Sequence, residues 1–287
     1  MEVMIFLAVS GFMFIIAAAF VSGKQSNAEF RQGINDINTQ IQQTINDVSN
    51  GFYPSGSSFT CSASASGLTI SGGSGPEQGA NQGCIFLGKV IQFGVNGTNG
   101  TGYDVYTLAG SQFANGAAGG NPPSNLAQAF PLTVDDNSVP PTPGGCTEVC
   151  RPPIPGYTPR VTGINLTELK TLEWGLAATK MTDNGSSIGA VGFISSFASQ
   201  TGVSLNSGSQ TVNVYAVPSN FGDTESTTVR NINLRLSDSD IRPNPDIVIC
   251  FDGGNGKYGS VTIGGSTSSQ RLSTSMRISS GTPPPGC

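Results

Sequence analysis

One acidic residue stands at the edge of a long uncharged run at the start of this chain. The run extends from Val3 to Gly23, and Glu2 precedes it directly. Its length is close to the roughly 20 residues with which a helix crosses the hydrocarbon layer of a membrane. No basic residue comes before it and no small-residue cleavage site ends it, unlike a removed signal peptide. The run therefore predicts a retained transmembrane or filament-core half-helix over residues 1–23, which needs lipid or other apolar helices around it.

The helical pattern continues past Gly23, but on one side only. Over residues 24–52 the apolar residues recur at intervals of three and four, which is one stripe on a helix with 3.6 residues per turn. Gly51 and Pro54 then supply a stop signal. The sequence predicts an amphipathic half-helix here that packs on one globular partner. Its stripe consists of Phe30, Ile34, Ile37, Ile41, Ile45, Val48 and Phe52.

Together, the apolar run, the acid at its edge and the amphipathic extension resemble the type IV pilin family, which includes the pseudopilins of type II secretion systems. The family carries a glutamate near the mature N-terminus of such a helix and commonly a glycine nine residues later; Glu2 and Gly11 match these positions. The family's frequent proline is absent, and Ala19 stands in its place. In pilins the glutamate is thought to neutralise the terminal amine of a neighbouring subunit, which makes a charge in an apolar bundle tolerable.

The resemblance implies a structural subunit of a type IV pilus or related filament, a helical homo-oligomer held together by the N-terminal helices. It implies an inner-membrane location before assembly, an extracellular filament on the cell surface afterwards, and a prepilin peptidase and pilus assembly machinery as partners. The rival interpretation is a monomeric, membrane-anchored ectodomain that binds or adheres without polymerising. The residues expected to mediate assembly are Glu2, Gly11, Phe12, Phe14, Ile15, Ile16 and Phe20.

The remaining residues, 53–287, are expected to form a β-rich ectodomain. The chain holds 39 glycines and 18 prolines and only 11% charged residues, a composition that favours short strands and many turns. The expected fold class is α+β, with a long N-terminal helix, apolar and then amphipathic, packed on a disulfide-stapled globular body. Short apolar or alternating segments predict strands at 67–71, 84–95, 103–109, 211–217, 231–236, 246–251 and 260–265.

Other parts of the ectodomain have different patterns. Residues 252–259 predict a hairpin turn between two of these strands. The Pro- and Gly-rich segment 117–160 is unsuited to central strands and is expected to be a long surface excursion that divides the ectodomain. Residues 166–181 and 188–199 are expected to be helices. The chain's only tryptophan, Trp174, is expected in the core.

All six cysteines lie in the ectodomain, which indicates disulfides made in an oxidising compartment. Their connectivity is open from sequence alone, and pairing of neighbours along the chain is favoured. A bridge to Cys287 would hold a tail that otherwise frays, and it resembles the C-terminal disulfide loop of many pilins. A zinc site is disfavoured because the chain has no histidine and no paired C-x-x-C motifs. The favoured pairs are Cys61–Cys84, Cys146–Cys150 and Cys250–Cys287.

No catalytic motif is visible, and an enzyme is not expected. The absence of histidine removes Ser–His–Asp and Cys–His arrangements, and no cofactor is expected. The net charge of −5 and the scattered basic residues argue against nucleic acid as a partner. Four oxygen-bearing residues share one loop and are weak candidates for a calcium site, although such loops are usually turns and the spacing is not that of an EF-hand. They are Asp238, Asp240, Asn244 and Asp246.

Four asparagines begin N-x-S/T triplets, the acceptor pattern for N-glycosylation. In Gly-rich loops such triplets arise from composition alone, so they are weak evidence for a modification. They are Asn96, Asn99, Asn165 and Asn184.

Overall fold

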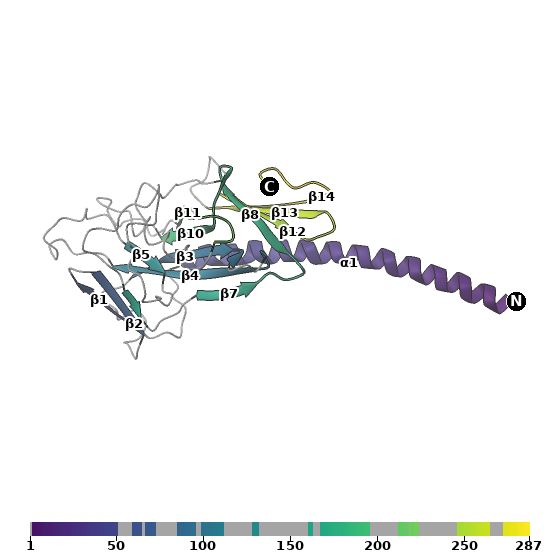
Figure 1. Cartoon of the computed structure of the whole chain (residues 1–287), viewed down its shortest axis with the longest axis horizontal. Coiled ribbons are helices and arrows are strands. Elements are labelled where there is room, and N and C mark those ends of the chain that lie inside the picture. The colour runs from purple at the N-terminus through teal and green to yellow at the C-terminus, as the bar shows by residue number, and fades with distance from the viewer. Residues whose placement is uncertain are drawn as a thin grey trace.

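The chain adopts an α+β fold in a computed structural model, as its sequence predicts, with one long helix and a β-rich body (Figure 1). The helix runs through the body and its N-terminal part projects far beyond it, whereas the C-terminus lies on the body. The residues that the structure describes are 2–50, 59–64, 67–72, 85–95, 99–111, 128–131, 160–162, 167–195, 212–217, 219–223, 246–264 and 272–287.

Helix α1 spans Glu2–Ser49 and joins both expected half-helices in one element. It ends before residue 52, and the Asn50 N–H closes its last turn by donating to the Asn46 carbonyl at 2.9 Å. The apolar stripe is confirmed, because it is the side of the helix that packs on the body. Its buried members are Phe30, Ile34, Ile37, Ile41 and Val48, with Ile45 partly buried and Phe52 outside the described residues.

Two larger sheets make up most of the described body. One has the strand order β11-β10-β3-β4-β5, with β7 also paired to β4, and its neighbouring strands are antiparallel. Strands β3, β4, β10 and β11 are buried on both faces, as the two separate clusters on them show. The strands are β3 (Ile85–Phe93), β4 (Gly102–Ser111), β5 (Gln128–Pro131), β7 (Thr167–Thr171), β10 (Ala190–Ser195) and β11 (Val212–Val217).

The second large sheet is antiparallel throughout, in the order β14-β13-β12-β8-β9. A small third sheet has the order β1-β2-β6, with β2 and β6 parallel. The strands of the second sheet are β8 (Ala177–Asp183), β9 (Ser186–Ser187), β12 (Ile247–Asp252), β13 (Lys257–Ile263) and β14 (Thr274–Ser280). Those of the third are β1 (Phe59–Ser64), β2 (Gly67–Gly72) and β6 (Arg160–Thr162).

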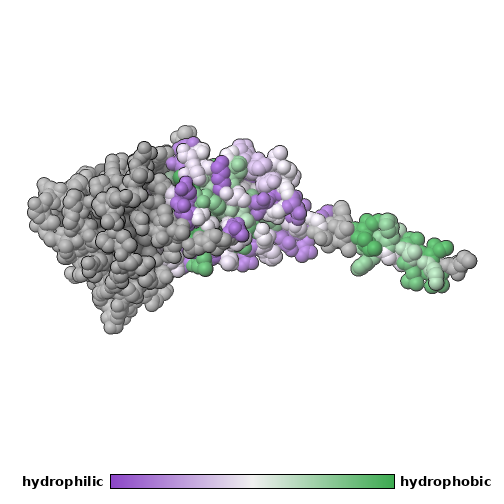
Figure 2. Space-filling view, viewed as in Figure 1, coloured by the Kyte–Doolittle hydropathy of each residue, from purple (hydrophilic) through white to green (hydrophobic). Residues whose placement is uncertain are grey.

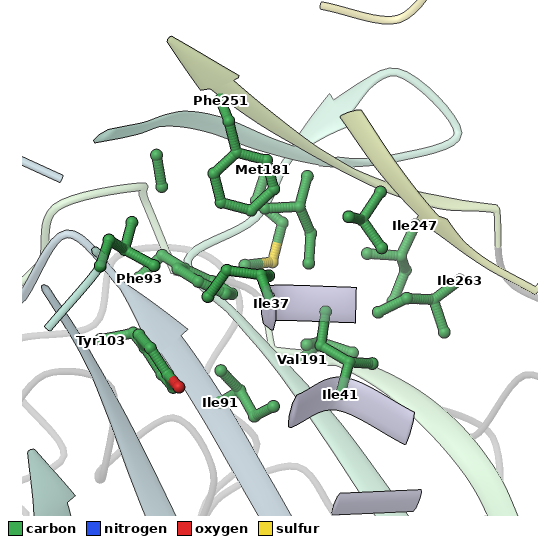
Figure 3. Close-up of a cluster of buried hydrophobic side chains, with 14 of the residues drawn as sticks. Ile37, Ile41, Ile91, Phe93, Tyr103, Met181, Val191, Ile247, Phe251 and Ile263 are labelled. Atoms are coloured by element: carbon green, nitrogen blue, oxygen red, sulfur yellow. The ribbon is translucent and has the colours of Figure 1, made fainter. Parts of the chain in front are cut away.

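The helical stripe packs into a single apolar core with both large sheets (Figure 3). Ile37 and Ile41 project from α1 among side chains of both sheets, which removes their apolar surface from water. Two glycines of the β12–β13 hairpin allow the helix to come this close. A Cβ atom at Gly253 would lie 2.1 Å from Phe30, and one at Gly259 would lie 2.8 Å from Ile34. The body therefore packs against α1 from residue 30 onward.

Six of the seven predicted strands coincide with strands of the structure, namely β2, β3, β4, β11, β12 and β13. The seventh, at 231–236, lies outside the described residues. The predicted hairpin turn is confirmed between β12 and β13, where Gly254, Asn255 and Gly256 all have positive φ. Within the Pro-rich segment 117–160, the structure describes β5 and residue 160; β5 pairs only at an end of its sheet, where a strand containing proline is tolerated.

The two helices predicted in the ectodomain were wrong. Residues 166–181 contain β7, a turn and most of β8, and residues 188–199 contain β10. β10 is buried on both faces, so its sequence is apolar without the alternation that marks a half-buried strand. Close contact between strands also explains its glycine, since a Cβ at Gly192 would lie 3.2 Å from the Tyr215 ring.

Candidate functional site

The N-terminal third of α1 presents a continuous apolar surface to solvent. Every side chain from Val3 to Ala17 is exposed, and this stretch contains no charged residue. Figure 2 shows it as a hydrophobic stretch in the projecting part of the helix, in contrast to the mixed surface of the coloured part of the body. Exposed apolar areas of this extent mark contact surfaces in soluble proteins. Because all sides of the helix are exposed here, a single flat partner would leave much of the surface in water.

The residues predicted to mediate assembly lie in this part of α1. The side chains of Phe12, Phe14, Ile15 and Ile16 are exposed, and Phe14 retains 75% of its accessible area. A Cβ atom added at Gly11 would meet nothing within 4 Å, so this position is an open notch in the helix surface. Glu2 and Phe20 lie in the same helix, with side chains outside the described set.

Polar contacts fix the orientation of the helix on the body. On one flank, the Lys89 ammonium on β3 pairs with the Asp47 carboxylate at 2.7 Å, and Lys89 is almost fully buried. On the opposite flank, the Gln42 amide donates to the Thr274 hydroxyl on β14 at 2.8 Å. Near the point where the helix leaves the body, the Lys257 ammonium donates to the hydroxyl of Ser26. The exposed stretch is therefore the projecting end of a helix that is fixed on both flanks.

A buried tyrosine lies where the helix-facing side of β4 meets β7. Tyr103 packs in the main core, with its ring centroid 5.2 Å from that of Phe93. Burial raises the pKa of the Tyr103 phenol to about 12, and the Glu168 carboxylate adds to this effect. The phenol thus stays neutral at neutral pH.

The opposite face of the same sheet holds a buried polar network. The Tyr106 hydroxyl donates to the Gln92 side-chain carbonyl at 2.7 Å and lies 3.3 Å from the Asp104 carboxylate. The Gln92 amide in turn donates to the backbone carbonyl of Asp223 at 2.8 Å. This network joins the sheet to the turn at 219–223. The sequence did not predict this network, because its members are distant along the chain. Gln92 and Asp223, for example, are 131 positions apart.

One of the three predicted disulfides is confirmed. Cys250 on β12 and Cys287 are bonded, with Cα atoms 5.6 Å apart. The bond holds the C-terminal residues against β12, where Pro284 is buried. Cys61 lies in β1, whereas Cys84, Cys146 and Cys150 are outside the described residues, so those two pairs stay predictions.

The weak calcium candidates are not brought together within the described structure. Only Asp246 is described, and its backbone carbonyl accepts from the Asn184 N–H at 3.4 Å. Asp238, Asp240 and Asn244 lie outside the described residues. Among the residues that are described, no three potential metal ligands of the His, Cys, Asp or Glu type form a cluster.

Two of the four N-x-S/T asparagines are visible, and both occupy turns. Asn99 and Asn184 are exposed and have φ of 49° and 48°, the left-handed conformation that asparagine tolerates better than most residues. This geometry accounts for both asparagines as turn residues. Asn96 and Asn165 are outside the described residues.

The prediction that Trp174 lies in the core was wrong. Trp174 retains 45% of its accessible area in the turn between β7 and β8, where the Leu176 N–H donates to the Glu173 carbonyl at 3.2 Å. Gly175 follows it with positive φ, and this glycine was the sequence signal for a turn that the hydrophobicity of the neighbouring residues obscured.

No helix within the described part of the chain is both long and apolar enough to be a candidate membrane span. No family model, curated protein or solved structure matches this chain.

Proposed function

We propose that the protein is a structural subunit of a type IV pilus or related filament, which polymerises through its N-terminal half-helix. The observation that carries the proposal is the apolar surface of residues 3–17, exposed on every side at the end of a firmly held helix. Copies of this half-helix packed around one another would cover most of its surface. The body, which is attached to the other end of α1, would then face outward.

The energetics favour this arrangement over exposure to water. Burial of the half-helix at about 25 cal/mol per Å² of apolar surface would yield on the order of tens of kcal/mol before entropic costs. Before assembly the half-helix would reside in the inner membrane. Lipid is itself apolar, so the net gain of moving from membrane to filament is much smaller, and transfer would need work from an assembly machinery.

The acid at the edge of the stretch supports the same function. Glu2 is the only charged residue before Lys24, and it lies in α1 beside the apolar surface. A carboxylate in such a bundle is costly unless it meets a positive charge. In a filament, the N-terminal amine of a neighbouring subunit would provide that charge.

Replacement of Glu2 tests the proposal. We expect Glu2→Gln to abolish surface filaments or reduce them severely, with filaments counted by electron microscopy and identified by mass spectrometry of sheared material. Glu29→Gln is the matched control, since Glu29 lies on the same helix and contacts Gln25 through a single side-chain hydrogen bond. Filaments that form normally in both variants would count against the role of the acid. A protein that stays monomeric in cells with intact surface fibres would favour a membrane-anchored adhesion module instead.

A further inference from the structure

The one tryptophan of the chain is displayed on the body rather than buried in it. Trp174 is 45% exposed and occupies the turn between β7 and β8. A partly exposed tryptophan combines a large apolar area with a hydrogen-bond donor, and tryptophan is among the residues most enriched at the energetic centres of protein interfaces. Its exposure is the first observation that points to a partner.

The backbone at Trp174 is strained. Its φ is 63° and that of Gly175 is 68°, so the turn has positive φ at both central positions, as in a type I′ turn. Asparagine, aspartate and glycine are the usual residues at the first of these positions, whereas a bulky side chain in the left-handed region costs roughly 1–2 kcal/mol. Folding alone would thus be better served by a smaller residue. Strain of this kind gathers at functional positions.

The position of the indole relative to α1 is the third observation. The Trp174 ring lies beside Gly33, 3.5 Å from where a Cβ atom of that residue would be. Gly33 is one turn beyond Phe30, the first residue of α1 that joins the core. Figure 1 shows the β7–β8 connection at the end of the body from which the helix projects. The indole therefore lies against the part of α1 that is held on the body, about two turns beyond Ser26, near which the helix leaves the body.

We propose that Trp174 is an anchor on the body for the apolar half-helix, residues 3–17, of a second copy of this chain. This inference rests on the proposed function and deepens it, because it names a contact between body and helix. Residues 3–17 of a second copy form a large exposed surface without charged residues. Their own chain does not cover this surface. Contact between two different patches of the same chain leaves one patch unused on each copy. Such contacts propagate into an open helical polymer rather than a closed dimer.

The variant Trp174→Asn separates a role in assembly from a role in folding. Asparagine suits the left-handed position, so we expect the thermal unfolding midpoint of the full chain in mild detergent to stay the same or rise. We expect the amount of assembled filament to fall at least about tenfold, as for loss of an interface anchor. Leu169→Ala is the matched control, because Leu169 is 70% exposed on the neighbouring strand β7 and has ordinary backbone geometry. That variant should assemble like the parent.

A photo-reactive benzoylphenylalanine at position 174 provides a second, independent test on the assembled filament. We expect intermolecular cross-links to peptides that contain residues 3–17. Cross-links that map only elsewhere, or a Trp174→Asn variant that assembles as well as the parent, would overturn the anchor while leaving the filament itself intact. If the parent chain forms no filament at all, the proposed function fails, and the inference about Trp174 fails with it.

Discussion

Burial of the Tyr103 phenol is expected to make the stability of the fold depend on pH. Its pKa is raised to about 12, from 10.0, so the folded protein holds the phenolic proton more tightly than the unfolded chain does. Below about pH 10 both states keep the proton, and the shift has no effect on stability. As the pH rises from there through about 12, the unfolded state loses its proton first, and folding becomes less favourable.

We predict that the free energy of unfolding falls in this pH window by up to about 2 kcal/mol because of Tyr103, since one pKa unit corresponds to about 1.4 kcal/mol. Urea unfolding of the full chain at about pH 8 and about pH 11.5 measures the fall, with Tyr103→Phe as the control that lacks the titrating group. The stability difference between parent and variant should shift in favour of the variant at the higher pH. An unchanged difference would contradict the prediction.

Trp174 and the glycines under the helix show what residue type alone can predict. Its hydrophobicity predicted that Trp174 lies in the core. In the structure, Trp174 lies in the turn between β7 and β8, and its side chain is partly exposed. Gly253 and Gly259 lie in or next to the hairpin that the sequence predicted correctly. These glycines also leave room for the side chains of Phe30 and Ile34. This second role depends on contacts between distant segments, so the sequence around each glycine does not predict it.

Among the elements, α1 was the most predictable, because apolar residues recur at intervals of three and four along its whole amphipathic half. The same spacing identified the buried stripe in advance. Strands with one polar face or flanking turns, such as β12 and β13, were also predictable. β10 was not, since both of its faces are covered and an apolar run carries no period. The apolar run at residues 3–17 could be read from the sequence, whereas the exposure of Trp174 required the fold.

Loss of the ion pair between Asp47 on α1 and Lys89 on β3 is expected to lower the stability of the fold. Lys89 and Asp47 have side chains with 8% and 24% exposure, so removal of one partner leaves a charge with little access to water. We predict that Asp47→Ala lowers the free energy of unfolding by about 2–4 kcal/mol. Denaturant unfolding of the full chain in mild detergent, followed by circular dichroism, measures this loss.

The double variant Asp47→Leu with Lys89→Met is the control for that prediction. It removes both charges and keeps apolar volume, so it should recover most of the stability that the single variant loses. If the single and double variants are equally unstable, the loss comes from packing, and the ion pair does not hold the helix in its orientation.

At the scale of the whole molecule, α1 has a part that packs in the core and a part that is exposed. Residues 30–48 form the core with both large sheets, so the body depends on them for its stability. Residues 3–17 contribute no side chain to that core, and all of them are exposed. Under the proposed function, the stability of the body and the assembly of a filament should therefore respond to different isoleucines of the same helix.

We predict that Ile34→Ala lowers the free energy of unfolding by about 2–5 kcal/mol, as expected for a fully buried isoleucine, whereas Ile15→Ala changes it by less than about 0.5 kcal/mol. Under the proposed function, Ile15→Ala should instead reduce filament formation, because the Ile15 side chain is exposed in the single chain and would be buried between copies. Guanidinium unfolding in mild detergent and filament yield by sedimentation measure the two effects on the same preparations. If Ile15→Ala destabilised the body as much as Ile34→Ala does, the exposed stretch would have to fold back onto its own chain, and it could not serve as the surface through which copies join.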